Sequence, residues 1–115
     1  MSLLEMVLAQ DIRAAGLPAP VTEQELIPGR KFRTDFAWPA YRIALEVDGG
    51  TWQMGRHQRP QGFAADCVKR NSLAVMGWLV LNVTGEMVSS KEALHWVERA
   101  LAARGWTREH EEVGA

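Results

Sequence analysis

Two neighbouring segments alternate between apolar and polar residues, and this pattern constrains the fold more than any other feature of the sequence. Segments 32–38 and 41–47 are rich in aromatic and β-branched residues and are joined by Pro39-Ala40, which predicts a β-hairpin. Successive side chains of a strand point to opposite faces, so each strand has one apolar face that can cover a core. These faces comprise Phe32, Thr34, Phe36 and Trp38 on the first strand and Tyr41, Ile43, Leu45 and Val47 on the second.

The opposite faces of the two strands carry the charged residues. Arg33 and Asp35 lie on the first strand, and Arg42, Glu46 and Asp48 lie on the second. A slip of one residue in the register would send one of these sets to the other face of the sheet. The matching apolar faces favour the register in which the three carboxylates project on the same side.

Three carboxylates on adjoining strands repel one another unless a cation lies among them. Carboxylate oxygens and water are the ligands that Mg²⁺ or Mn²⁺ prefers, and the sequence has no His or Cys cluster with zinc spacing. The pattern therefore predicts a magnesium site, in which manganese can substitute. The alternative is a solvated sheet face on which Arg33 and Arg42 balance the charge.

At these residues the sequence resembles the PD-(D/E)XK nuclease superfamily, in which acids on two adjoining strands hold a metal ion. Asp35 matches the first acid of the motif and Glu46 matches the second, whereas Asp48 stands where the motif usually has lysine. The resemblance implies that Asp35 and Glu46 are metal ligands. It also implies that another residue must supply the charge of the missing lysine.

Within the superfamily the sequence is similar to small phage-encoded endonucleases and to relatives of very-short-patch-repair endonucleases. The likeness covers most of residues 30–88 and rests on an ordered set of short motifs. These are Arg33-Thr34-Asp35-Phe36, Pro39, Glu46-Val47-Asp48-Gly49-Gly50, Gly55-Arg56-His57, Gly62-Phe63, residues 66–71 and Gly77-Trp78-Leu79-Val80.

The remaining elements predict an α/β fold with a mixed sheet of about four strands flanked by helices. Apolar periodicity predicts a helix over 2–15, a strand over 21–27, a helix over 62–76 and a strand over 78–83. Ser89 is expected to cap a last helix that Gly105 ends. In the helix over 62–76, we expect Phe63, Cys67 and Ala74 to share one face, joined by Leu73. The family resemblance implies a restriction-endonuclease-like core.

The length of 115 residues predicts one domain, which we expect to span residues 1–106, followed by a charged, flexible tail over 107–115. The sequence lacks a membrane-spanning apolar run and the layout of a signal peptide. A single cysteine, Cys67, excludes an intramolecular disulfide. We therefore expect a cytoplasmic protein, in the bacterial host if a phage encodes it.

The charge is unevenly distributed, although the net charge is only -1. Residues 30–83 contain eight Lys or Arg and four acids, and three of these acids are the candidate metal ligands. A positive segment of this kind suits a phosphodiester substrate.

Two candidate site residues outside the hairpin each have a structural alternative. Glu5 completes a capping box with Ser2, but the resemblance to archaeal-type Holliday junction resolvases implies that it can reach the metal site. Lys69 and Arg70 follow Asp66 at the spacing of helical salt bridges. Several PD-(D/E)XK relatives deliver the catalytic lysine from a following helix, which implies that Lys69 replaces the lysine missing at position 48.

The polar loop over 49–61 holds the other candidates for contact with nucleic acid. Arg56 and Arg59 suit phosphate contacts, and Trp52 can stack on an unpaired base. His57 is a candidate proton donor, or simply a solvated histidine. Arg33 and Arg70 extend this expected contact surface.

These features predict a metal-dependent endonuclease that hydrolyses phosphodiester bonds of DNA. Asp35 and Glu46 would hold Mg²⁺, Asp48 or Glu5 would complete the shell, and Lys69 would orient the attacking water. The expected substrate is branched DNA, cut by a homodimer in the manner of a Holliday junction resolvase. A mismatch or nicking endonuclease is one alternative. A catalytically decayed module that binds nucleic acid is another.

Overall fold

The computed structural model describes residues 1–48 and 60–108, which form helices and strands in the order that the sequence predicts, with one additional helix. Their bounds are α1 (Leu3–Ala14), β1 (Val21–Glu25), β2 (Arg33–Trp38), a 3₁₀ turn η1 (Pro39–Tyr41), β3 (Ile43–Asp48), α3 (Pro60–Val75), β4 (Leu79–Thr84), α4 (Gly85–Ser90) and α5 (Glu92–Ala103).

The four strands form one mixed sheet in the order β1-β2-β3-β4. The first three strands pair antiparallel, and β4 runs parallel to β3, to which it is connected through α3. A parallel neighbour requires a crossover connection, which α3 supplies here. The prediction of a mixed sheet of about four strands is confirmed.

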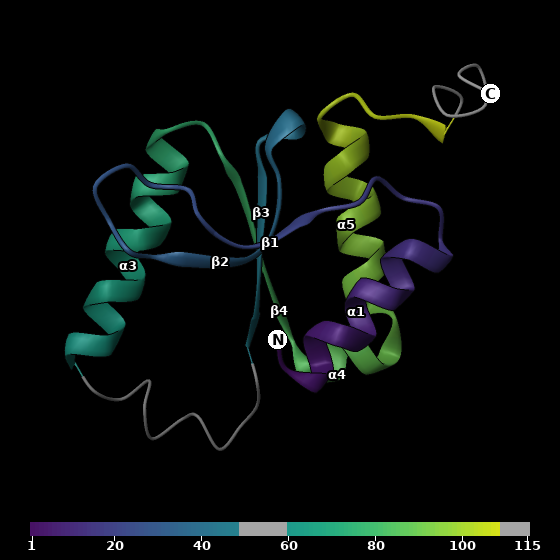
Figure 1. Cartoon of the computed structure of the whole chain (residues 1–115), viewed down its shortest axis with the longest axis horizontal. Helices are drawn as coiled ribbons and strands as arrows, with labels where there is room; N and C mark the ends of the chain where they lie inside the picture. Colours follow the sequence, from purple (N-terminus) through teal and green to yellow (C-terminus); the bar gives the residue numbers. More distant parts are fainter. Residues whose placement is uncertain (49–59, 109–115) are drawn as a thin grey trace.

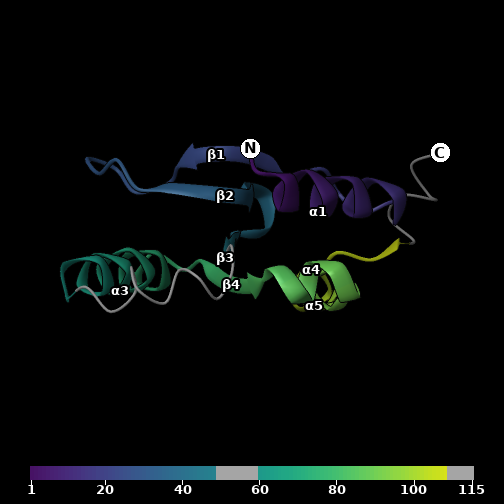
Figure 2. The same cartoon turned by 90° about the horizontal axis from the view of Figure 1, so that it is seen from below.

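The helices cover opposite faces of this sheet. Figure 1 shows α1, α4 and α5 on one side of the sheet and α3 on the other, and Figure 2 shows the same separation after a quarter turn. The larger apolar core lies under α1, α4 and α5. Its members include Leu8, Ile12, Phe36, Trp38, Ile43, Leu45, Val83, Val97 and Leu101.

A smaller apolar cluster lies between α3 and the other face of the sheet. Ala37 and Ala44 supply its sheet side, Leu73 reaches it from α3, and Ile27 and Trp78 close it. Both alanines are fully buried in this cluster. This helix therefore lies on the same face as Asp35 and Glu46, which alternate with the core residues of β2 and β3.

The register of the hairpin is the one favoured by its apolar faces. Phe36 pairs with Leu45 and Trp38 pairs with Ile43, so the predicted apolar faces of β2 and β3 coincide. The turn is longer than the predicted Pro39-Ala40 connection, because Tyr41 and Arg42 also belong to it and β3 begins only at Ile43. It is the 3₁₀ turn η1, closed by a hydrogen bond from the Arg42 amide to the Pro39 carbonyl, with Arg42 left-handed at φ 55°.

Phe32 departs from the predicted face. It lies before β2 begins and packs with the smaller cluster under α3, because the chain has not yet entered the paired part of the sheet.

The predicted face of α3 is correct only in part. Leu73 is fully buried and Cys67 is half-buried, whereas Phe63 and Ala74 are exposed. Several sides of this helix carry apolar residues, so periodicity alone did not select the side that meets the sheet.

The predicted cap of the last helix is wrong. Ser89 lies inside α4, whose N-cap is Thr84: its hydroxyl accepts a hydrogen bond from the Met87 amide at 3.2 Å. Lys91 is left-handed at φ 74° and separates α4 from α5. Gly105 follows the end of α5 at φ 98°, a conformation that glycine adopts without strain.

None of the helices in residues 1–48 and 60–108 is long and apolar enough to cross a membrane. The predicted tail over 107–115 lies outside the described residues from position 109 onward.

Candidate active site

Asp35 and Glu46 lie side by side where β2 and β3 begin to separate. The last hydrogen-bonded pair at this end is Phe36 with Leu45, and the next step along the same register brings Asp35 opposite Glu46. The Asp35 Oδ2 atom accepts a hydrogen bond of 2.8 Å from the Val47 amide. This bond fixes the Asp35 carboxylate across the strand pair, so the two acids are held by the backbone itself.

Lys69 reaches this pair from α3. Its Nζ atom lies 2.5 Å from Glu46 Oε2 and also donates a hydrogen bond to the backbone carbonyl of Arg33. The Lys69 side chain is only 12% exposed and that of Glu46 is 28% exposed. Lys69 therefore contacts the acid on β3, as one of the two alternatives from the sequence predicts, and not Asp66 as the other does.

The protonation of Glu46 reflects opposing influences. Burial raises the pKa of the Glu46 carboxyl above its ordinary value, while the hydrogen bond and positive charge of Lys69 act to lower it. The charge of Asp35 raises the pKa further. The net direction is upward, so the half-buried carboxylate binds a proton more readily than an exposed one does.

We expect the effect of Glu46→Gln on stability to depend on pH. Because folding raises the pKa of Glu46, the stability contributed by its neutral form is fully present below the unfolded pKa and is lost as pH rises through the folded pKa. The melting temperature of the wild type, measured in EDTA, should therefore fall relative to that of Glu46→Gln between pH 4 and pH 7.5. A relative rise would mean that attraction to Lys69 outweighs burial.

The other two candidate acids are not brought into this pair. Asp48 is exposed at the end of β3, two residues beyond Glu46. Glu5 lies on α1, which packs on the opposite face of the sheet, and its carboxylate accepts a hydrogen bond from the Ser2 hydroxyl at 3.1 Å. The Glu5 amide donates to Ser2 Oγ at 3.2 Å, so the capping geometry is present.

Arg33 is exposed beside the acidic pair, with its guanidinium 3.7 Å from the Glu23 carboxylate. Glu23 lies on the edge strand and is left-handed at φ 52°, which is uncommon for a residue other than glycine. In the sequence, Glu23 alternates with less polar residues, so it can either approach the site or be an exposed charge of an edge strand. An alternating Glu is common on an edge strand. This pattern does not indicate that the backbone of Glu23 is left-handed.

Arg70 is exposed on α3 next to Lys69. Arg30 and Lys31 are exposed before β2, so together with Arg33 they form a basic segment that leads to Asp35. The predicted loop contacts Trp52, Arg56, His57 and Arg59 lie outside the described residues.

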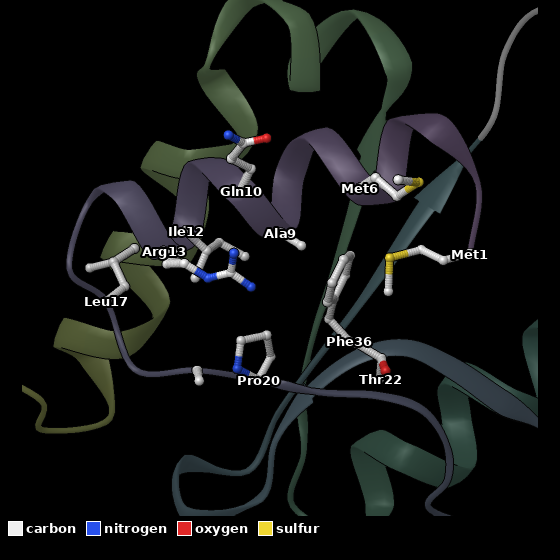
Figure 3. Close-up of a pocket in the computed structure, with 11 residues that line it drawn as sticks. Met1, Met6, Ala9, Gln10, Ile12, Arg13, Leu17, Pro20, Thr22 and Phe36 are labelled. Carbon is white, nitrogen blue, oxygen red and sulfur yellow. The ribbon is translucent and has the colours of Figure 1, made fainter.

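A pocket of about 500 Å³ lies elsewhere, between α1, the segment over 17–20 and the sheet. Figure 3 shows Phe36 pointing toward α1 in this pocket, with Met1 and Met6 beside it. Phe36 belongs to the core face of β2, so the pocket is on the face opposite the acids. No candidate site residue lines it. The acidic site is instead an open surface on the α3 side of the sheet.

The donor set of the acidic pair suits a magnesium ion bound mainly by water. In the described ranges, no group of three or more His, Cys, Asp or Glu residues is arranged to hold a metal. Asp35 uses Oδ2 and Glu46 uses Oε2 in the contacts above, so each retains a second carboxylate oxygen. Mg²⁺ commonly binds through one or two carboxylates and completes its shell with water and substrate phosphate. Two carboxylates are therefore a sufficient protein contribution.

Comparison with known proteins gives one informative match. No protein-family model and no curated protein matches the sequence. Among solved structures, the catalytic domain of the homing endonuclease I-Bth0305I has a similar fold, with a TM-score of 0.69 and 13% sequence identity. The alignment covers 92% of this chain and 100% of that chain. The four-stranded mixed sheet flanked by helices is thus the restriction-endonuclease-like fold of an endonuclease catalytic domain.

Proposed function

We propose that this protein is a metal-dependent endodeoxyribonuclease of the PD-(D/E)XK type. The observation that carries the proposal is the convergence of Asp35, Glu46 and Lys69 on one face of a sheet that has the fold of an endonuclease catalytic domain. Two acids and a lysine are the chemical groups of the PD-(D/E)XK motif. The lysine comes from α3 instead of the position that Asp48 occupies.

In the proposed reaction, Asp35 and Glu46 would hold Mg²⁺, for which Mn²⁺ could substitute. A bound divalent ion would activate a water molecule and offset the negative charge that develops on the phosphoryl oxygens. Lys69 is held against Glu46 and the Arg33 carbonyl. From there its ammonium can donate a hydrogen bond to the attacking water and partly balance the two carboxylates.

Phosphates that flank the cleaved bond would contact the basic residues around the pair. Arg33 and the exposed segment before it lie on one side, and Arg70 lies on α3. Arg56, Arg59, His57 and Trp52 remain proposed contacts from the loop. Asp48 remains proposed as a further acid that completes the shell when DNA and metal are bound, whereas the position of Glu5 on the opposite face favours its capping role.

The proposed substrate is branched DNA, cut in the manner of a Holliday junction resolvase. The resemblance of the sequence to archaeal-type Holliday junction resolvases and the small size of the domain support this substrate. A mismatch or nicking activity of the very-short-patch-repair type is the second candidate, supported by the ordered motifs between Arg33 and Val80.

The direct test is cleavage of three labelled DNAs: a four-way junction, a mismatched duplex and a linear duplex. Each is incubated with Mg²⁺, Mn²⁺ or EDTA. Metal-dependent cutting of the junction at symmetric positions is expected, with EDTA abolishing it. Preferential cutting of the mismatched duplex would favour the second candidate. If the protein binds DNA but does not cleave it with either metal ion, this would indicate a catalytically decayed module that binds nucleic acid.

Symmetric cutting of a junction requires two active sites, so we propose a homodimer. The helix α3 supports this proposal because Val68 and Val75 are exposed on the same side of it, with Val75 87% exposed. Exposed apolar residues that share one side of a helix are typical of an interaction surface.

Val75→Glu is expected to convert the dimer to a monomer, because it places a charge in an apolar contact. The mass in solution can be followed by light scattering, with the melting temperature measured in parallel. Leu3→Glu, at an exposed apolar residue of α1, is the matched control and should leave the mass unchanged. A monomeric wild type at micromolar concentration would contradict the dimer.

A further inference from the structure

Asn82 lies directly beside Glu46 in the sheet. In the parallel pairing of β3 with β4, Glu46 is the partner of Asn82. Paired residues on neighbouring strands project on the same face, and the strands are about 4.8 Å apart. Asp35, Glu46 and Asn82 therefore form one row across three strands, with Glu46 in the middle.

The placement of Asn82 is fixed by the residues around it. Leu81 and Val83 point to the larger core, which forces Asn82 to the α3 face, where Val80 also lies. Lys69 contacts Glu46 from α3, and Asn82 flanks the same carboxylate from β4. The amide is thus held next to the acidic pair by the packing of its neighbours.

The side chain of Asn82 is exposed, and it makes no hydrogen bond with any residue in the part of the chain that the structure describes. Asparagine is depleted in strands, so its presence inside β4 gives no local structural benefit. A side-chain amide supplies two donors and one acceptor without adding charge. Unlike another carboxylate, it can therefore approach a phosphate beside two acids without repulsion.

We propose that Asn82 binds the cleaved phosphate directly: its amide donates a hydrogen bond to one non-bridging oxygen. This inference rests on the proposed nuclease function and adds a substrate-contacting residue to it. The three residues of the row would then have different roles. Asp35 and Glu46 carry the negative charge, and Asn82 supplies a neutral donor on the far side of Glu46 from Asp35. A single donor of this kind would hold the phosphate in one orientation relative to the two acids.

The test is single-turnover cleavage by Asn82→Ala, with Asn71→Ala as the matched control. Asn71 is an exposed asparagine on the outer side of α3. Loss of one hydrogen bond to a charged phosphate should slow cleavage about tenfold to a hundredfold, with the melting temperature unchanged. Asn82→Asp should be slower still, because it places a third carboxylate in the row.

A sulfur substitution at the cleaved phosphate distinguishes a phosphate contact from a structural role. If Asn82 had only a structural role, Asn82→Ala would leave the effect of the sulfur unchanged. Replacing one non-bridging oxygen by sulfur weakens its hydrogen bonds, so one of the two stereoisomers should be cut slowly by the wild type. Asn82→Ala should cleave the two stereoisomers at nearly equal rates. An unchanged difference, or cleavage by Asn82→Ala at the wild-type rate, would overturn the inference while the nuclease function stands. A wild type that cuts no DNA with either metal would overturn both.

Discussion

Asp35→Asn and Glu46→Gln are each expected to abolish DNA cleavage while the protein stays folded. Either change removes a charged oxygen ligand from the proposed metal site. The structure explains why these two replacements preserve the fold. Asparagine keeps an oxygen that can accept the Val47 amide, and glutamine keeps one that can accept Lys69. DNA binding should survive, because the loss of a negative charge lowers repulsion from phosphate. Cleavage is measured with Mg²⁺ and Mn²⁺, and folding by thermal melting.

Asp35→Ala is the informative comparison for the first of these variants. It removes the acceptor of the Val47 amide and leaves that half-buried donor unpaired, at a cost of about 1–3 kcal/mol. The melting temperature should fall by about 4–8 °C for each kcal/mol lost. The Asn and Ala variants should therefore be equally inactive but differ in stability. Full activity of Asp35→Asn or Glu46→Gln would exclude this site.

Lys69→Ala is expected to reduce the cleavage rate by at least about a hundredfold, as expected for removing a group that orients or deprotonates the nucleophile. The contact with Glu46 places the ammonium beside the proposed metal ligand. Lys69→Arg should restore little activity, because a planar guanidinium does not replace a compact ammonium at this position. Single-turnover rates at saturating DNA isolate this effect from binding.

The structure also predicts that Lys69→Ala is less stable than the wild type. Lys69 links α3 to both β2 and β3, so Lys69→Ala should also lower the melting temperature, and rates must be measured well below it. Arg70→Ala is the comparison on the same helix. Arg70 is exposed, so its loss should weaken DNA affinity and leave the rate at saturation unchanged. Equal, small losses of rate in both variants would contradict a catalytic part for Lys69.

The pairing of β2 with β3 could be predicted because several apolar residues, close together in the sequence, all indicate it. Phe36 and Trp38 of β2 face the same core as Ile43 and Leu45 of β3, and a slip of one residue would turn one of these sets to the other face. This pattern predicted that Asp35 and Glu46 project on the same side of the sheet. The approach of Lys69 was predictable only as one of two alternatives, since helical pairing with Asp66 uses the same spacing.

Other features had no usable signal in the sequence. The outer side of α3 is as apolar as its inner side, so the pattern did not reveal which side meets the sheet. The short helix α4 depends on the hydroxyl of Thr84, and the competing cap at Ser89 has an equally good local sequence. Asn82 was missed because its pairing with Glu46 joins residues far apart in the chain. An alternating polar residue in the strand over 78–83 was the available signal.

The strict alternation along β2 and β3 separates two sets of positions within strands of only six residues each. One set packs against α1, α4 and α5, and the other faces α3 and the open surface. Natural selection can therefore act on the chemistry of one set with little effect on the packing of the other. A charged residue can therefore be exchanged on the face toward α3 while the packing against α1, α4 and α5 is retained.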